Sequence, residues 1–152
     1  MKRLVDVHTD EIMAGSAETI LHSDAKRACM VLCAYDSMKK IGGLAHAMFL
    51  SGPAAEKKHS SAAIREADRA IDEMLSDMMM MGARKENIEV CFIAGENVPH
   101  KQNDPEYNKT LTSALEVLKQ KQIKLREGSL NDVGNRHICF DVETGSVSTT
   151  EK

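Results

Sequence analysis

The stretch that most constrains this chain runs from Cys29 to His46. It holds two apolar runs, residues 28–35 and 41–50, on either side of the polar turn Asp36-Ser-Met-Lys-Lys. Short apolar runs that are bounded by turn residues are typical of buried β-strands. If the two runs pair as antiparallel strands, a thiol and an imidazole can meet across the sheet. Catalysis by a sulfur nucleophile requires at least these two groups, a nucleophile and a base.

The composition predicts one globular domain that spans residues 1–152 and is long enough to bury a core. Apolar residues make up 42% of the chain and charged residues 28%, as in soluble globular proteins. The net charge is −3, and aromatic residues make up only 3%. A nucleic-acid partner is therefore not expected, because neither a basic face nor a base-stacking platform is available.

The N-terminal residues begin like a signal peptide, but Asp6, His8 and Asp10 interrupt the apolar segment that such a peptide needs. No stretch approaches the roughly 20 apolar residues that cross a membrane. The sequence therefore predicts a cytoplasmic protein without membrane insertion, whose four cysteines are reduced thiols. The histidines show no metal-ligand spacing, and no cofactor is expected.

Hydrophobic periodicity predicts a sheet-rich fold with two main helices. The helices are expected from residue 60 or 61 to about 81, ended by Gly82, and over 109–122, where Leu115 and Leu118 face inward. Strands are expected over residues 4–8, 18–22, 28–35, 41–50, 88–94, 123–126, 137–142 and 146–149, with a polar tail that frays from about residue 148. Neighbouring strands look hairpin-connected, so we expect an α/β (α+β) fold of mixed, largely antiparallel sheets with the helices outside.

Cys29 and Cys33 are four residues apart, and the local structure decides whether they could bond to each other or share a metal ion. On a strand they lie about 13 Å apart, which is too far for a disulfide. On a helix they would be neighbours and could share a metal ion. The apolar character of the run favours the strand. Cys91 and Cys139 lie in the middle of predicted strands and are interpreted as small core residues.

A lone cysteine or histidine in an apolar strand is most often a core residue, but several local features favour a catalytic pair here. Cys29 opens its strand beside a loop, and Lys26 and Arg27 lie just upstream, where positive charge favours a thiolate. Two alanines flank His46 and leave space around it. Ser23 could orient the imidazole, which completes the candidate catalytic set Cys29, His46 and Ser23.

Three blocks of sequence resemble a known family. The first is Cys29-x3-Cys33 followed by Ile41-Gly-Gly-Leu-Ala-His-Ala-Met48, the second is Ile93-Ala-Gly95, and the third is Gly134-Asn-Arg136 followed by Glu143-Thr-Gly145. Each block alone is short, but in this order, between about residues 18 and 147, they resemble the chemoreceptor glutamine deamidases of the CheD family.

The resemblance implies a layered sandwich of mixed sheets with helices outside, and a Cys–His–Thr catalytic set. By this resemblance, the family's nucleophile corresponds to Cys29, its base to His46 and its threonine to Ser23. The implied reaction is hydrolysis of glutamine side chains, and by the same route of glutamate methyl esters, through a thioester. The implied partners are the cytoplasmic helices of chemoreceptors (methyl-accepting chemotaxis proteins) and a CheC-type phosphatase.

One departure from the family concerns the loop before the nucleophile. The family carries a glycine-rich loop that ends in Gly-Ser, whereas this chain has Asp24-Ala-Lys-Arg-Ala28. Glycines permit backbone angles that these residues resist, so amides that would stabilise an oxyanion can be displaced and activity reduced. The alternative is a catalytically weakened adaptor that docks on receptors or on the phosphatase. A third hypothesis is a thiol redox or metal protein that uses Cys29 and Cys33.

Overall fold

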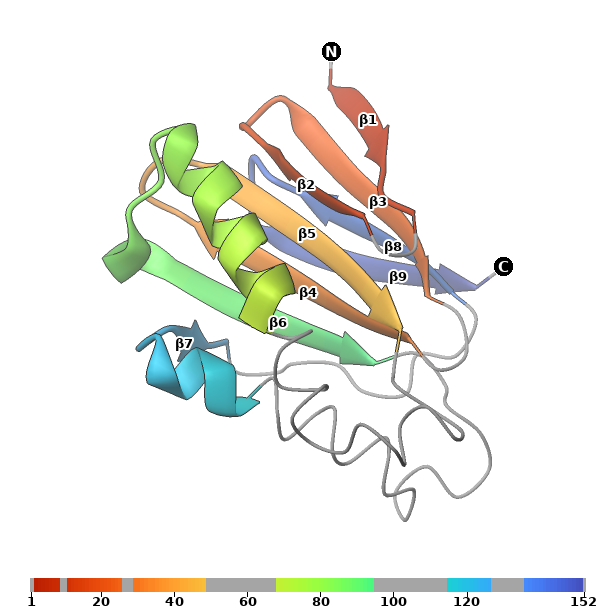
Figure 1. The fold of residues 1–152 in the computed structure, drawn as a ribbon. Coiled ribbons are helices and arrows are strands. Elements are labelled where there is room, and N and C mark those ends of the chain that lie inside the picture. The colour runs from red at the N-terminus through yellow and green to blue at the C-terminus, as the bar shows by residue number, and fades with distance from the viewer. Residues whose placement is uncertain are drawn as a thin grey trace, which may run out of the picture.

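The computed structural model describes residues 2–8, 11–25, 29–48, 68–94, 115–126 and 136–151. Within them the chain forms two packed sheets and two α-helices (Figure 1). The strands are β1 (Arg3–Asp6), β2 (Ile12–Gly15), β3 (Thr19–Ala25), β4 (Cys29–Asp36), β5 (Ile41–Met48), β6 (Ile88–Ala94), β7 (Lys124–Leu125), β8 (Arg136–Asp141) and β9 (Ser146–Glu151). A short 3-10 helix, η1 (Lys85–Asn87), precedes β6.

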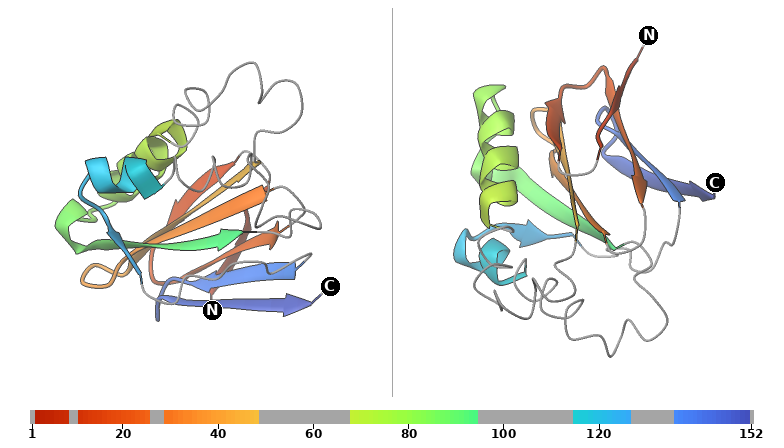
Figure 2. Two further views of the ribbon diagram at one scale, coloured as in Figure 1. Left: turned by 90° about the horizontal axis from the view of Figure 1, so that it is seen from below. Right: turned by 45° about the vertical axis from the view of Figure 1, so that its right-hand side comes forward.

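The first sheet has the strand order β1-β3-β8-β9, and the second has the order β2-β5-β4-β6-β7. Two pairs, β1–β3 and β6–β7, are parallel, and the others are antiparallel. The described helices, over residues 68–80 and 115–120, lie on the side of the second sheet that faces away from the first (Figure 2). These mixed, largely antiparallel sheets with helices outside are the predicted fold class.

The central hairpin forms as the sequence predicts. β4 and β5 pair antiparallel, with Tyr35 opposite Gly42 and Val31 opposite His46. The buried carboxylate of Asp36 closes the turn, because its Oδ1 accepts hydrogen bonds from the amides of Met38 (2.9 Å) and Lys39 (3.1 Å). The same side chain therefore fixes the turn that brings the two strands together.

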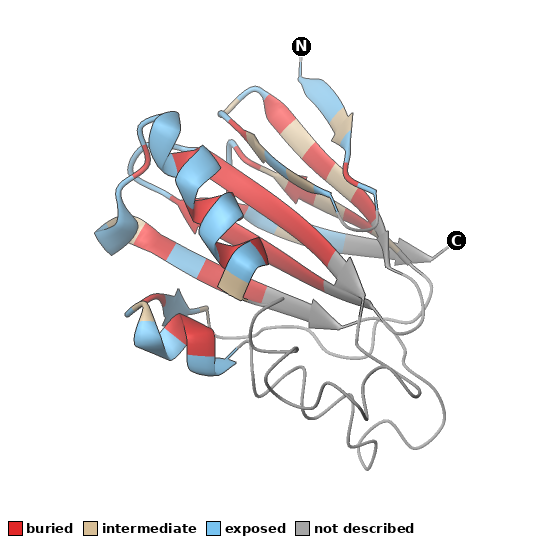
Figure 3. Cartoon of the chain, viewed as in Figure 1, coloured by how far each residue is buried: buried red, intermediate tan, exposed pale blue. Residues whose placement is uncertain are grey.

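Two apolar cores lie on the two faces of the second sheet. One core packs the helices on the sheet and includes Leu32, Ala45, Ile71, Met74 and Met78. The other fills the space between the sheets and includes Leu21, Val31, Leu44, Ile138 and Phe140. Figure 3 shows the buried residues of the first described helix on the side that faces the sheet. Alternation along β4 and β5 thus divides their side chains between two buried layers, which explains why the runs are continuously apolar.

Glycines on β5 allow both layers to approach closely. A Cβ atom at Gly43 would lie 2.8 Å from Met74 Cγ on the helix side, and one at Gly42 would lie 2.8 Å from Phe140 on the other side. The first described helix ends as predicted at Gly82, which has a φ of +115°. The amide of Ala83 donates to the carbonyl of Met78, which satisfies a terminal carbonyl of the helix.

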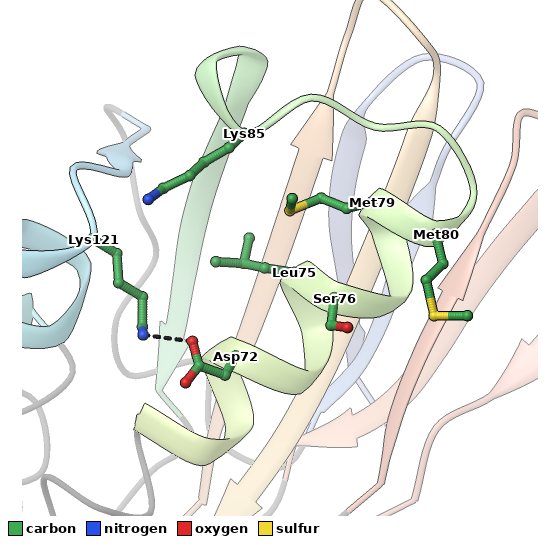
Figure 4. Close-up of a pocket in the computed structure, with 7 residues that line it drawn as sticks. All are labelled: Asp72, Leu75, Ser76, Met79, Met80, Lys85 and Lys121. Atoms are coloured by element: carbon green, nitrogen blue, oxygen red, sulfur yellow. Dashed lines mark hydrogen bonds and ion pairs between the residues drawn. The ribbon is translucent and has the colours of Figure 1, made fainter.

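A surface hollow of about 530 Å³ is lined by residues of the first described helix, by Lys85 of η1 and by Lys121, which follows the second described helix (Figure 4). Leu75 and Met79 point toward Lys85 and Lys121 in this hollow, and Lys121 is paired with Asp72. Burial tends to lower the pKa of Lys121, but hydrogen bonds to its acidic partners outweigh it and raise that pKa overall. None of the helices in the described ranges is long and apolar enough to span a membrane.

Predictions for two edge strands and for the second described helix differ from the structure. β2 was not predicted, because a four-residue edge strand without alternation leaves little pattern to detect. The last strand, predicted over residues 146–149, extends to Glu151, which pairs with Arg136. Leu115, expected inside, is 38% exposed, and Val117 and Leu118 are buried instead. The predicted beginnings of both helices lie outside the described residues.

Candidate active site

A serine and a histidine from opposite sheets meet at one end of the core between the sheets. Ser23 lies on β3 of the first sheet, and His46 lies on β5 of the second. The two side chains are 2% and 3% exposed, respectively. Ser23 Oγ and His46 Nδ1 are 2.7 Å apart, which is a hydrogen-bond distance. The structure therefore brings together two of the three predicted site residues.

The backbone carbonyl of Val7 determines the direction of this hydrogen bond. Ser23 Oγ donates its only hydrogen to the Val7 carbonyl oxygen, at 2.6 Å. The hydroxyl must then accept from His46, so the neutral imidazole carries its hydrogen on Nδ1. The lone pair is consequently on Nε2, which is the ring nitrogen able to take a proton from a nucleophile.

Backbone hydrogen bonds hold both ends of this chain of contacts. The Val7 amide donates to the carbonyl of His22 at 2.7 Å, which fixes the segment that follows β1. The His46 amide donates to the carbonyl of Glu11 at 3.1 Å, beside the start of β2. The acceptor, the hydroxyl and the imidazole therefore rest on three segments that are distant in the sequence.

Cys29 is the first residue of β4, as the sequence predicts. In the backbone register it lies opposite Met48 and two positions from Val31, the direct partner of His46. Cys29 and His46 thus occupy diagonal positions on paired strands. The residues just before Cys29, at positions 26–28, lie outside the described residues, and so does most of the altered loop.

The buried cysteine of the same strand is chemically unsuited to be a nucleophile. Burial among apolar side chains raises the pKa of the Cys33 thiol far above neutral pH. Because β4 is a strand through both cysteines, Cys29 and Cys33 are not helical neighbours that could share a metal ion. Among the described residues no group of three His, Cys, Asp or Glu side chains is arranged to hold a metal.

Sequence reasoning missed the part played by Val7. Its contribution is a main-chain carbonyl, which every residue has, so no residue type or spacing could have indicated it. The serine was proposed from its hydroxyl and its place before Cys29. Its contact with His46 depends instead on how the first sheet packs against the second.

The fold and the site define a two-sheet α+β domain with a buried hydroxyl–imidazole pair between its sheets. A similar fold occurs in the crystal structure of the Neisseria meningitidis protein NMB0706, of the family DUF152, with a TM-score of 0.52 and 7% identity. That match covers 88% of this chain and 63% of the other, which is less than two thirds of its length, and it shows the fold alone.

The chain belongs to the CheD family of chemotactic sensory transduction, whose family model matches residues 49–151. It is 30% identical over 143 residues to the probable chemoreceptor glutamine deamidase CheD of Chlorobium luteolum, covering 94% of this chain and 70% of that protein. It is 32% identical over 136 residues to the protein of the same name in Methanococcus maripaludis strain C5, covering 87% and 82%. The family model begins after β5, whereas these two relatives align with most of the chain.

Proposed function

We propose that this protein is a chemoreceptor glutamine deamidase, a hydrolase in which Cys29 is the nucleophile and His46 the base. The observation that carries the proposal is the hydrogen-bond chain from His46 Nδ1 through Ser23 to the Val7 carbonyl, which leaves Nε2 as the basic nitrogen. Side chains at alternate positions of a strand share a face. We therefore expect Cys29 on the same face as Val31 and His46, within reach of Nε2.

The reaction is acyl transfer in two stages. His46 Nε2 takes the proton of the Cys29 thiol, and the thiolate attacks the carboxamide carbon of glutamine. The imidazolium returns its proton to the nitrogen as the carbon–nitrogen bond breaks, so ammonia leaves and a thioester remains. His46 then takes a proton from water, and the resulting attack on the thioester releases glutamate and the Cys29 thiolate, which recovers the proton. A glutamate methyl ester enters in the same way and releases methanol.

Ser23 contributes to this cycle as a positioning residue. Its oxygen accepts from Nδ1–H in both the neutral and the charged imidazole, so no reorganisation is needed when His46 is protonated. The hydroxyl is itself held by the Val7 carbonyl. The ring is therefore kept in one tautomer and one orientation throughout the two stages.

The names of the relatives support glutamine side chains of chemoreceptors as the substrates. The receptor helices that carry them are cytoplasmic, and we place this protein in the cytoplasm for that reason. Each deamidation replaces a neutral amide by a carboxylate and adds one negative charge to a helical bundle. Such a charge can shift the packing equilibrium of the receptor.

Incubation with a cytoplasmic chemoreceptor fragment should convert glutamine to glutamate. We expect a mass increase of about 1 Da at individual glutamines, measured by peptide mass spectrometry, because the NH₂ group is replaced by OH. A fragment whose modified glutamines are replaced by alanine is the control and should not change. A folded preparation that leaves several receptor fragments unmodified after long incubation would contradict the proposal.

Replacement of Ser23 tests the tautomer argument. We expect Ser23→Ala to lower kcat by about 10- to 100-fold with little change in KM, because the imidazole loses the group that orients it. Ser23→Thr keeps the hydroxyl and should retain most of the activity. A shift of the acid limb of the kcat–pH profile in Ser23→Ala distinguishes positioning from loss of folding. Equal kcat and pH profiles in the wild type and Ser23→Ala would refute this role.

A second candidate function is a catalytically weakened adaptor, which the absence of glycine between Asp24 and Ala28 favours. If the amides of this loop do not stabilise an oxyanion, the protein still docks on receptors or on a CheC-type phosphatase. Losing one oxyanion donor costs on the order of 100-fold or more in rate. Tight binding of the phosphatase combined with no thiol labelling of Cys29 near neutral pH would favour the adaptor over the enzyme.

A further inference from the structure

The connection between β1 and β2 carries a carboxylate that lies outside the proposed catalytic set. Glu11 immediately precedes β2, which pairs antiparallel with β5 and has Ile12 opposite Ala45. The carbonyl of Glu11 accepts the His46 amide at 3.1 Å, which continues this pairing by one position. Glu11 thus lies opposite the proposed base on the neighbouring strand.

The side chain of Glu11 turns back to the start of the same connection. Its Oε1 accepts a hydrogen bond from the His8 amide at 2.8 Å, and the Glu11 amide donates to the His8 carbonyl at 2.9 Å. Two hydrogen bonds therefore join residues 8 and 11. The one to the carboxylate is charge-assisted, which is the stronger kind.

The His8 amide and the Val7 carbonyl belong to the same peptide unit. Because the peptide bonds of the described residues are all trans, the N–H and the C=O of this planar unit point in opposite directions. Glu11 holds the N–H, and the C=O accepts the Ser23 hydroxyl at 2.6 Å. Fixing one end of the plane therefore fixes the direction of the other.

These contacts form one continuous chain in which every donor points the same way. The imidazole of His46 donates to Ser23, and the hydroxyl of Ser23 donates to the Val7 carbonyl. The N–H of that same peptide unit donates to the carboxylate of Glu11. Hydrogen bonds in such a chain polarise one another, and a carboxylate at its end strengthens donation along the chain.

We propose that Glu11 is a second positioning residue for His46, acting through the peptide unit that its carboxylate holds and through Ser23. The role rests on the proposed function, because it concerns the orientation of the proposed base. Glu11 secures this residue at two points. Its carbonyl holds the main chain of His46, and its carboxylate ends the hydrogen-bond chain that holds the ring.

Steady-state deamidation by the full chain tests the proposal. We expect Glu11→Ala to lower kcat by about three- to tenfold with little change in KM, because one hydrogen bond of the chain is lost while Ser23 remains. Glu11→Gln keeps an acceptor oxygen and should recover most of that loss. Glu18→Ala removes an exposed carboxylate just before β3 and should leave kcat unchanged. A wild-type kcat in Glu11→Ala, or a rate in Glu11→Gln no higher than in Glu11→Ala, would overturn the proposal.

A double variant separates positioning of the base from a general loss of stability. In Ser23→Ala the chain is already broken between the imidazole and the peptide unit. Adding Glu11→Ala should therefore lower kcat by a smaller factor than it does in the wild type. Losses that simply multiply would show that the two residues act independently, which contradicts the proposed role.

Amide hydrogen exchange measures the link to His46 without a deamidase assay. The His46 amide should exchange faster in Glu11→Ala, because its acceptor lies in the connection that the carboxylate holds. The amide of Leu32, in the middle of β4, reports global opening, and we expect the increase at His46 to exceed any increase there by at least about threefold. Equal increases at the two amides would refute the role of Glu11 whatever the activity. A larger increase at His46 in a protein that deamidates no glutamine would support the link and contradict only the proposed function.

Discussion

A Cys29→Ala variant should lose glutamine deamidation by on the order of 10⁴-fold or more. Alanine has no group that can form the thioester, and the remaining His46 and Ser23 can then only activate water. The rate of conversion of glutamine to glutamate in a receptor fragment, followed by mass spectrometry, measures the loss. The assay needs a long time course, because the slowest rate that it detects limits the largest loss of activity that it can measure.

Cys33→Ala is the matched control for that experiment. It makes the same substitution four residues further along β4, at a buried thiol whose raised pKa keeps it protonated. We expect it to stay within a few-fold of the wild-type rate and to cost some stability, because a small cavity forms between the sheets. Deamidation that survives Cys29→Ala, or that is lost only in Cys33→Ala, would remove Cys29 as the nucleophile.

An Asp36→Ala variant should lower the free energy of unfolding by about 3–5 kcal/mol. The buried carboxylate accepts from the amides of Met38 and Lys39 in the turn. It also accepts from the amide of Arg84, at 2.8 Å, in the loop that follows the first described helix. One side chain therefore holds the β4–β5 turn and anchors the loop between helix and sheet, and its removal leaves three donors without their acceptor.

Urea denaturation followed by circular dichroism measures that loss. Asp36→Asn retains one acceptor oxygen and should be destabilised less than Asp36→Ala. Asp77→Ala removes an exposed carboxylate of the first described helix and should change stability by no more than about 0.5 kcal/mol. A loss below about 1 kcal/mol in Asp36→Ala would mean that water replaces the carboxylate at all three amides.

The second sheet and the first described helix were the most predictable parts of the fold. In β4 and β5, residues 31–36 and 41–46 are buried on both faces of the sheet, so the apolar pattern of these two strands is strong. The helix stripe that contains Ile71, Met74 and Met78 is buried as its spacing predicts. These elements can be recognised because the periodic pattern of a buried face occurs within one contiguous stretch of sequence.

The edges of the sheets were less predictable. β2 is an edge strand of four residues, and its assignment depends on pairing with β5 rather than on its own pattern. The end of β9 is polar, so only its ladder with β8 reveals it as a strand. In both cases hydrogen bonds to a partner strand stabilise a segment whose own residues have little preference for the strand conformation.

For the candidate site, the residue pattern predicts that Cys29 and His46 lie on neighbouring strands. Two apolar runs joined by a turn that contains Asp36 can form their hairpin from local information, and this hairpin puts the two residues on adjacent strands. Only the packing of the two sheets brings Ser23, whose hydroxyl donates to the Val7 carbonyl, into contact with His46. That contact depends on packing between strands that are remote in the sequence. Neither residue spacing nor hydrophobic pattern predicts how two sheets are stacked.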